Sequence, residues 1–63
     1  MERILTSAME IKKRTQVTSL FAGNGFKIVM TDFDRMTFER ANTKVNIRYD
    51  LSSNVESIHI LQK

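Results

Sequence analysis

Between residues 15 and 61, apolar side chains recur at every second position in several short stretches. This period puts alternate side chains on opposite faces of the chain and is typical of half-buried β-strands. Turn-forming residues separate the stretches, at residues 23–25, 32–34, 42–43 and 52–54. The pattern predicts five strands that begin about every ten residues, the spacing of a small barrel or sandwich. The predicted strands contain residues 17–21, 26–30, 36–38, 45–49 and 55–61.

The chain before residue 15 has a helical period instead. Ile4, Ala8 and Ile11 recur at the i, i+4, i+7 spacing of one helix face. The same helix cannot continue through residues 17–21, because at about 100° per residue their apolar side chains lie on the opposite side. We therefore predict a helix over about residues 2–13, followed by the five strands over about residues 15–61. The expected fold is a single, mainly β domain: a short N-terminal helix followed by a five-stranded barrel or sandwich.

Few ways of stabilising so short a chain remain. Its 63 residues form one domain at most, and a chain of this length buries only about 60% of the surface that it exposes when unfolded. The sequence has no cysteine and a single histidine, His59, which excludes disulfides, thiolate zinc sites and multi-histidine metal sites. We therefore expect no metal or cofactor, and we expect self-association. A net charge of +3 is small in a monomer, but a ring would multiply it and attract polyanions.

Two classes of function find no support. No stretch approaches the roughly 18 consecutive apolar residues of a membrane span, and the start lacks the apolar run of a signal peptide. We expect a cytoplasmic protein without a membrane partner. No serine, threonine or lysine has a recognisable base partner, and turn chemistry explains the neighbouring Asp32 and Asp34. We therefore expect no catalytic site.

Three segments carry a resemblance to a known family. Residues 14–27 read RTQVTSLFAGNGFK, where a Val-Thr-Ser-hydrophobic stretch runs into Asn-Gly-Phe; residues 33–38 read FDRMTF, and residues 47–53 read IRYDLSS. In this order they resemble the first hairpin, the Phe-Asp-x-Phe segment and the Tyr-Lys-His-Ala-Ile-Ser-Thr segment of the bacterial Sm-like (Hfq) RNA chaperones. The chain differs from that family by a shorter second strand and an additional Gly23. Met36 also replaces the aromatic that stacks on uracil, and Arg48-Tyr49 replaces Lys-His.

The resemblance implies a divergent Sm-like protein, folded as a five-stranded open barrel with a short N-terminal helix. It also implies a homo-oligomeric ring, hexameric in the family, that pairs small RNAs with their targets. It implies three RNA-binding surfaces for U-rich or A-rich single strands. The pore would use Arg35, Met36, Arg48 and Tyr49. The rim would use Lys12, Lys13 and Arg14. The distal surface would use Leu20, Phe26, Lys27 and Ile28. Three alternatives remain open: core packing for Met36, a solvated helix end for the rim residues, and sheet core with an exposed lysine for the distal set.

Two other functions fit the same pattern. One is a small phage-type protein-binding inhibitor or interaction module, built as an α+β meander with the helix on one face. The other is a basic DNA-binding protein. The ring hypothesis expects the predicted strand at residues 45–49 of one subunit to pair with residues 55–61 of the next. The mass in solution separates these functions, because the ring requires a hexamer and the interaction module a monomer or dimer.

Overall fold

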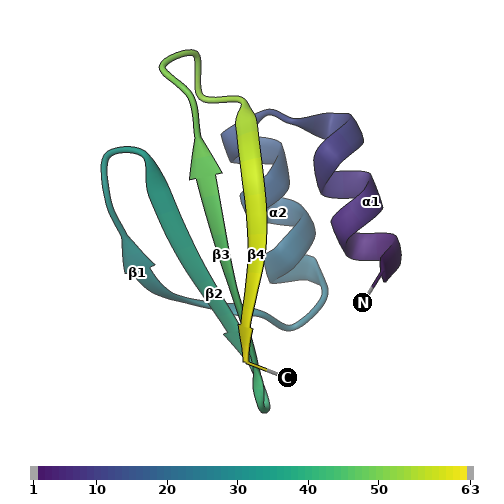
Figure 1. Cartoon of the computed structure of the whole chain (residues 1–63). Helices are drawn as coiled ribbons and strands as arrows, with labels where there is room; N and C mark the ends of the chain where they lie inside the picture. The colour runs from purple at the N-terminus through teal and green to yellow at the C-terminus, as the bar shows by residue number, and fades with distance from the viewer. Residues whose placement is uncertain (1, 63) are drawn as a thin grey trace.

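In the computed structural model, which describes residues 2–62, two helices lie against one face of a four-stranded antiparallel sheet (Figure 1). The helices are α1 (Glu2–Ile11) and α2 (Arg14–Gly23), and the strands are β1 (Lys27–Thr31), β2 (Arg35–Arg40), β3 (Thr43–Tyr49) and β4 (Val55–Gln62). The strand order is β1-β2-β3-β4, so the sheet is a simple meander with β1 and β4 at its edges. We call the side toward the helices the covered face and the other side the open face. The protein is therefore a small α+β protein with an open sheet.

The prediction of a strand at residues 17–21 is wrong, because these residues lie within α2. Val17 and Phe21, one helical turn apart, are fully buried against the sheet. The Thr18 hydroxyl donates a hydrogen bond of 2.8 Å to the carbonyl of Arg14, which satisfies this polar side chain inside the helix. In place of the predicted five-stranded barrel, the described residues form four strands in an open sheet, since the first predicted strand is a helix.

A break between the two helices explains the reversal of the apolar faces. Helix α1 ends at Ile11, two residues before the predicted end. Lys12 adopts a left-handed conformation with φ of 67°, and its N–H donates to the carbonyl of Ala8 at 2.9 Å. A left-handed residue after the last turn is a common way to end a helix. Lys13 is then extended and precedes α2. The chain thus changes direction, and the buried Ile4 and Ala8 face the same core as the apolar residues of α2.

The glycine-rich segment after α2 ends a helix and does not form the predicted hairpin turn. The Asn24 side chain donates to the carbonyl of Leu20 at 2.8 Å, and Gly25 takes a positive φ of 86°. Glycine and asparagine are favoured at helix C-termini as they are in hairpins. The other four predicted strands are confirmed to within a few residues as β1 to β4. The turn predicted at residues 32–34 and the break at residues 52–54 are also confirmed.

The core lies between the helices and the covered face. The rings of Phe21 and Phe38 stack with centroids 4.7 Å apart, and Phe26 meets Phe21 edge-on at 5.0 Å. Such aromatic pairs add to the free energy gained by burying apolar area. The buried apolar residues are Ile4, Ala8, Val17, Phe21, Phe26, Met36, Phe38, Val45, Ile47, Tyr49 and Val55. None of the helices within residues 2–62 is long and apolar enough to cross a membrane.

The pairing of β3 corrects the expected contact between ring subunits. Residues 45–49 and 55–61, expected to pair between neighbouring subunits, pair within one chain as β3 and β4. Since β2 pairs with the other side of β3, no side of β3 is left for a neighbour. The free edges belong to β1 and to β4 beyond its first residue, Val55, whose N–H donates to the carbonyl of Lys12 at 2.8 Å.

Candidate functional site

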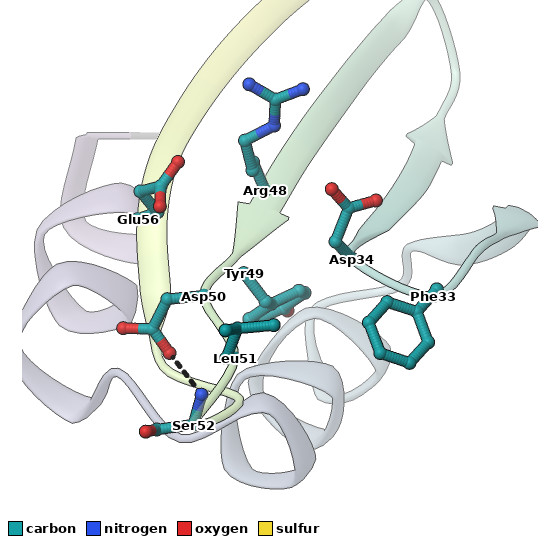
Figure 2. Close-up of a pocket in the computed structure, with 8 residues that line it drawn as sticks. All are labelled: Phe33, Asp34, Arg48, Tyr49, Asp50, Leu51, Ser52 and Glu56. Atoms are coloured by element: carbon teal, nitrogen blue, oxygen red, sulfur yellow. Dashed lines mark hydrogen bonds between the residues drawn. The ribbon is translucent and has the colours of Figure 1, made fainter.

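Two loops meet at one end of the sheet, at the top of Figure 1. One connects β1 to β2 through residues 32–34, and the other connects β3 to β4 through residues 50–54. Between them is a shallow depression of about 590 Å³, which we call the loop-end site (Figure 2). Its lining residues are Phe33, Asp34, Arg48, Tyr49, Asp50, Leu51, Ser52 and Glu56.

The loop-end site carries the two most exposed large apolar side chains among the described residues. Phe33 is 82% exposed and Leu51 is 93% exposed. Each lies in a turn next to aspartate, where the backbone leaves the sheet and has no core to face. A single exposed apolar residue is common on protein surfaces. Two that belong to separate loops and line one depression are typical of an interaction surface.

Hydrogen bonds hold both loops in place. In the β3–β4 loop, the carboxylate of Asp50 accepts hydrogen bonds from the N–H groups of Ser52 at 2.8 Å and Asn54 at 3.0 Å. In the β1–β2 loop, the Arg14 guanidinium on α2 donates to the carbonyl of Phe33 at 2.7 Å and to the carbonyl of Asp32 at 2.8 Å. Helix α2 therefore fixes the segment that presents the Phe33 ring.

Tyr49 lies beneath the loop-end site and joins it to the core. Its N–H donates to the carbonyl of Asp34 at 2.7 Å, and the Arg14 guanidinium lies 4.9 Å from the centre of its ring. The side chain is 2% exposed, and its hydroxyl has no hydrogen-bond partner among the described residues. Burial raises the pKa of the Tyr49 hydroxyl above the ordinary value for tyrosine, and the positive charge of Arg14 lowers it by a smaller amount.

The raised pKa of Tyr49 predicts a loss of stability at alkaline pH. Because the folded pKa lies above the unfolded value of about 10, the stabilisation is complete below pH 10 and is lost as the pH rises through the folded pKa. Tyr49 is the only tyrosine and the chain has no tryptophan, so tyrosinate absorbance reports this group alone. We expect an absorbance midpoint above that of the urea-unfolded chain. We also expect Tyr49→Phe to be as stable as the wild type or up to about 1–3 kcal/mol more stable, since it removes an unpaired buried hydroxyl. A Tyr49→Phe variant that keeps the full alkaline loss would contradict this assignment.

Charge is unevenly distributed around the site. Arg35 forms ion pairs with Asp32 at 3.7 Å and with Asp34 at 3.6 Å. Arg48, which lies opposite Arg35 in the ladder between β2 and β3, forms no ion pair within residues 2–62. The lining of the depression contains the carboxylates of Asp34, Asp50 and Glu56 and the single guanidinium of Arg48. Asp34 is paired with Arg35, so the lining carboxylates that form no ion pair within residues 2–62 are those of Asp50 and Glu56.

The four residues predicted for the pore lie on two different faces of the sheet. Arg35 and Arg48 lie side by side on the open face, since they pair across β2 and β3. Met36 and Tyr49 point to the covered face and are buried in the core. Met36 therefore packs in the core, which is the alternative that the sequence left open for it.

The residues predicted for the rim and for the distal surface also differ in exposure and contacts within each set. Lys12 and Lys13 are exposed at the break between the helices, whereas the guanidinium of Arg14 binds the β1–β2 loop. In the distal set, Phe26 is buried and Leu20 packs against the core, while Lys27 and Ile28 are exposed on β1.

Sequence reasoning missed Phe33 and Leu51 as candidate contact residues. The available signal was an apolar residue inside a polar turn: phenylalanine between two aspartates, and leucine between aspartate and serine. An apolar side chain in such a turn is not part of the alternating pattern that places strand residues in a core, so it is expected to be exposed.

No group of three or more histidine, cysteine, aspartate or glutamate side chains that could hold a metal ion occurs in the described part of the chain. Comparison of the chain with protein-family models, curated proteins and solved structures gave no match. The resemblance to the Sm-like RNA chaperones stays a prediction from the residues quoted above.

Proposed function

We propose that this protein is a non-catalytic, cytoplasmic protein-binding module that docks on a partner protein through the loop-end site. The observation that supports this most directly is the pair Phe33 and Leu51, exposed at 82% and 93% on two loops around one depression. The α+β meander is also the architecture expected of the interaction module.

The chemistry of the loop-end site defines the partner. Large apolar anchors surrounded by polar groups are the usual source of binding energy at protein interfaces. Phe33 and Leu51 would enter an apolar pocket of the partner. The carboxylates of Asp50 and Glu56, which form no ion pair within residues 2–62, favour a partner with lysine or arginine beside that pocket. The same negative charge disfavours a nucleic acid backbone at this site.

The loops are suited to binding because they are already ordered. Arg14 holds the β1–β2 loop and Asp50 holds the β3–β4 loop through backbone hydrogen bonds. A surface fixed in advance loses less conformational entropy on association.

The decisive variant is Phe33→Ser combined with Leu51→Ser. Both side chains are exposed, so we expect the fold to persist, as far-UV circular dichroism can check. The partner is first identified by affinity purification from cell extract and mass spectrometry. Its affinity is then measured with purified proteins by calorimetry. We expect the double variant to weaken binding by at least about 2 kcal/mol, or roughly 30-fold in Kd.

Ile11→Ser is the matched control, since it also removes an exposed apolar side chain but from the end of α1. We expect this variant to bind the partner as tightly as the wild type. A partner that binds the double variant with unchanged affinity would refute the assignment of the loop-end site. Enrichment of no protein by the wild type over the double variant would refute the proposed function.

RNA binding is a second candidate, supported by the positive charge of the open face. Four cations share this face. Arg35 pairs with Asp32 and Asp34, and Lys44 pairs with Glu39, whereas Lys27 and Arg48 form no ion pair among the described residues. Because the buried aromatics lie on the covered face, such binding would depend on phosphate contacts.

Fluorescence anisotropy with oligo-U and oligo-A tests this candidate. For the double variant Lys27→Ala/Arg48→Ala, we expect weaker binding and a log–log salt slope smaller by about 1.4, at about 0.7 per lost phosphate contact. The pair Lys12→Ala/Lys13→Ala tests the predicted rim in the same assay. Absence of binding to either RNA at about 50 mM salt, where phosphate contacts are strong, would eliminate RNA binding.

A further inference from the structure

The edge strand β1 contacts α2 but stays exposed along its whole length, and its centre is apolar. All five of its residues are exposed, including Ile28 and Val29, both at 48%, and Met30. Ile28 lies opposite Phe38 and therefore points to the covered face, where a side chain would normally meet a helix. Free edges are usually protected by charges, prolines, bulges or a covering element. β1 has a bulge near Val29 and a lysine at its first position, but its middle is open and apolar.

The opposite edge of the sheet has the complementary feature. A groove of about 610 Å³ runs between α1 and β4, lined by Leu5, Met9, Ile58, His59 and Ile60. Leu5 and Met9 are one turn apart on α1, beside the buried stripe of Ile4 and Ala8. Ile58 and Ile60 lie opposite the buried Ile47 and Val45, so they too point to the covered face. The groove is therefore mainly apolar and lies on the free edge of β4.

The helix layer is displaced relative to the sheet. In Figure 1, α1 lies beside β4 at the side of the molecule away from β1. Helix α1 contacts α2 and β4; Leu5 is partly buried against the core, whereas Met9 beside the groove is 44% exposed. One edge thus has an exposed apolar strand, and the other has an apolar groove that is only partly filled.

We propose that β1 of a second copy of this chain pairs with the free edge of β4 and packs on α1. The added strand would form main-chain hydrogen bonds with β4, as in β-strand addition. If the sheet continues with the same faces, Ile28 of the second copy points toward Leu5 and Met9. This places its half-exposed side chain in the groove and covers the α1 side chains. The occupant is a second copy because the chain itself supplies an exposed apolar strand that fits the site.

The contact joins two different surfaces, so it is head-to-tail. Each copy keeps one free β1 and one free groove, and the association continues until a ring closes or a chain grows. This distinguishes the proposal from a twofold dimer through paired β1 edges or paired β4 edges. It uses neither Phe33 nor Leu51, so it stands or falls independently of partner binding at the loop-end site.

The test uses two variants, each with one damaged surface. Ile28→Lys damages β1, and Met9→Lys damages the groove; both positions are exposed, and circular dichroism verifies the fold. Masses are measured by sedimentation velocity and native mass spectrometry at about 100 µM, which exceeds a micromolar Kd. We expect the wild type to form trimers or larger species and each variant alone to be monomeric. An equimolar mixture of the two variants should form a 1:1 dimer, since it restores one intact contact and no more. Leu51→Lys, which adds the same charge at the loop-end site, should assemble as the wild type does.

A monomeric wild type at this concentration would overturn the proposal. Assembly of Met9→Lys alone would indicate β1–β1 pairing, and assembly of Ile28→Lys alone would indicate pairing through β4; either result overturns the head-to-tail contact. If Ile28→Lys fails to fold, Ile28→Thr, which keeps the β-branched shape, takes its place with the same expected masses.

Discussion

Phe38→Ala is expected to leave the protein largely unfolded at room temperature. Phe38 is fully buried at the centre of β2, where its ring stacks on Phe21 at 4.7 Å. Replacing a buried phenylalanine by alanine lowers the free energy of unfolding by about 3–5 kcal/mol. The loss arises because less apolar surface is buried and because the neighbouring side chains do not fill the cavity completely. A 63-residue domain has a total stability of only about 3–9 kcal/mol, at roughly 0.05–0.15 kcal/mol per residue. The expected loss is therefore comparable to the whole free energy of unfolding.

Urea denaturation followed by far-UV circular dichroism measures this effect. Phe33→Ala is the matched control: it removes the same side chain from a position that is 82% exposed, and its stability should change by no more than about 0.5 kcal/mol. A Phe38→Ala variant with the wild-type midpoint would show that the ring of Phe38 does not lie in the core.

The last four strands could be predicted from the sequence because apolar side chains alternate along them, and in β3 this alternation matches burial. In β3, Val45, Ile47 and Tyr49 are buried, and the residues between them are more exposed. This is the physical origin of alternation, so the pattern and the structure agree. The β1 strand shows the limit of this reasoning: its alternation resembles that of β3, yet all five of its residues are exposed. Burial of β1 depends on the neighbouring elements, which no local pattern describes.

Of the two helices, α1 could be predicted from the sequence but α2 could not. The spacing of Val17 and Phe21 fits one helical turn, but with Ser19 between them it also fits the alternation of a strand. The β-branched Thr15, Val17 and Thr18 favour a strand by intrinsic preference, and packing against the sheet outweighs that preference in the structure. The glycine-rich segment that follows does not separate the two cases, because it suits both a hairpin and a helix end.

The candidate site depended even more on tertiary contacts. Phe33 and Leu51 have a local signal, since each is an apolar residue in a polar turn. That they lie around one depression follows from the meander, which brings alternate loops to the same end of the sheet. The hydrogen bonds of Arg14 join residues 18 and 19 positions apart in the chain. Sequence spacing gives no indication of such a contact, so the resemblance alone predicts Arg14 as part of a rim.

Ser19→Pro is expected to destabilise the protein by about 3 kcal/mol or more. Ser19 lies in the interior of α2 with an exposed side chain, so the substitution removes no side chain from the core. Proline removes one helical hydrogen bond, and its ring clashes with the carbonyl four residues before it. Because α2 supplies the buried Val17 and Phe21, a kink at its centre would also separate these side chains from the sheet.

Ser19→Ala is the control that separates a backbone effect from loss of the hydroxyl. Alanine is the best helix former, so this variant should be as stable as the wild type or about 0.5 kcal/mol more stable. If residues 17–21 instead formed an exposed strand, alanine would be neutral or unfavourable there. Proline at an edge position would also cost much less than in a helix. Both variants are compared with the wild type by thermal and urea denaturation. A Ser19→Pro variant within about 1 kcal/mol of the wild type, well below the cost of an interior helical proline, would therefore argue for the strand and against α2.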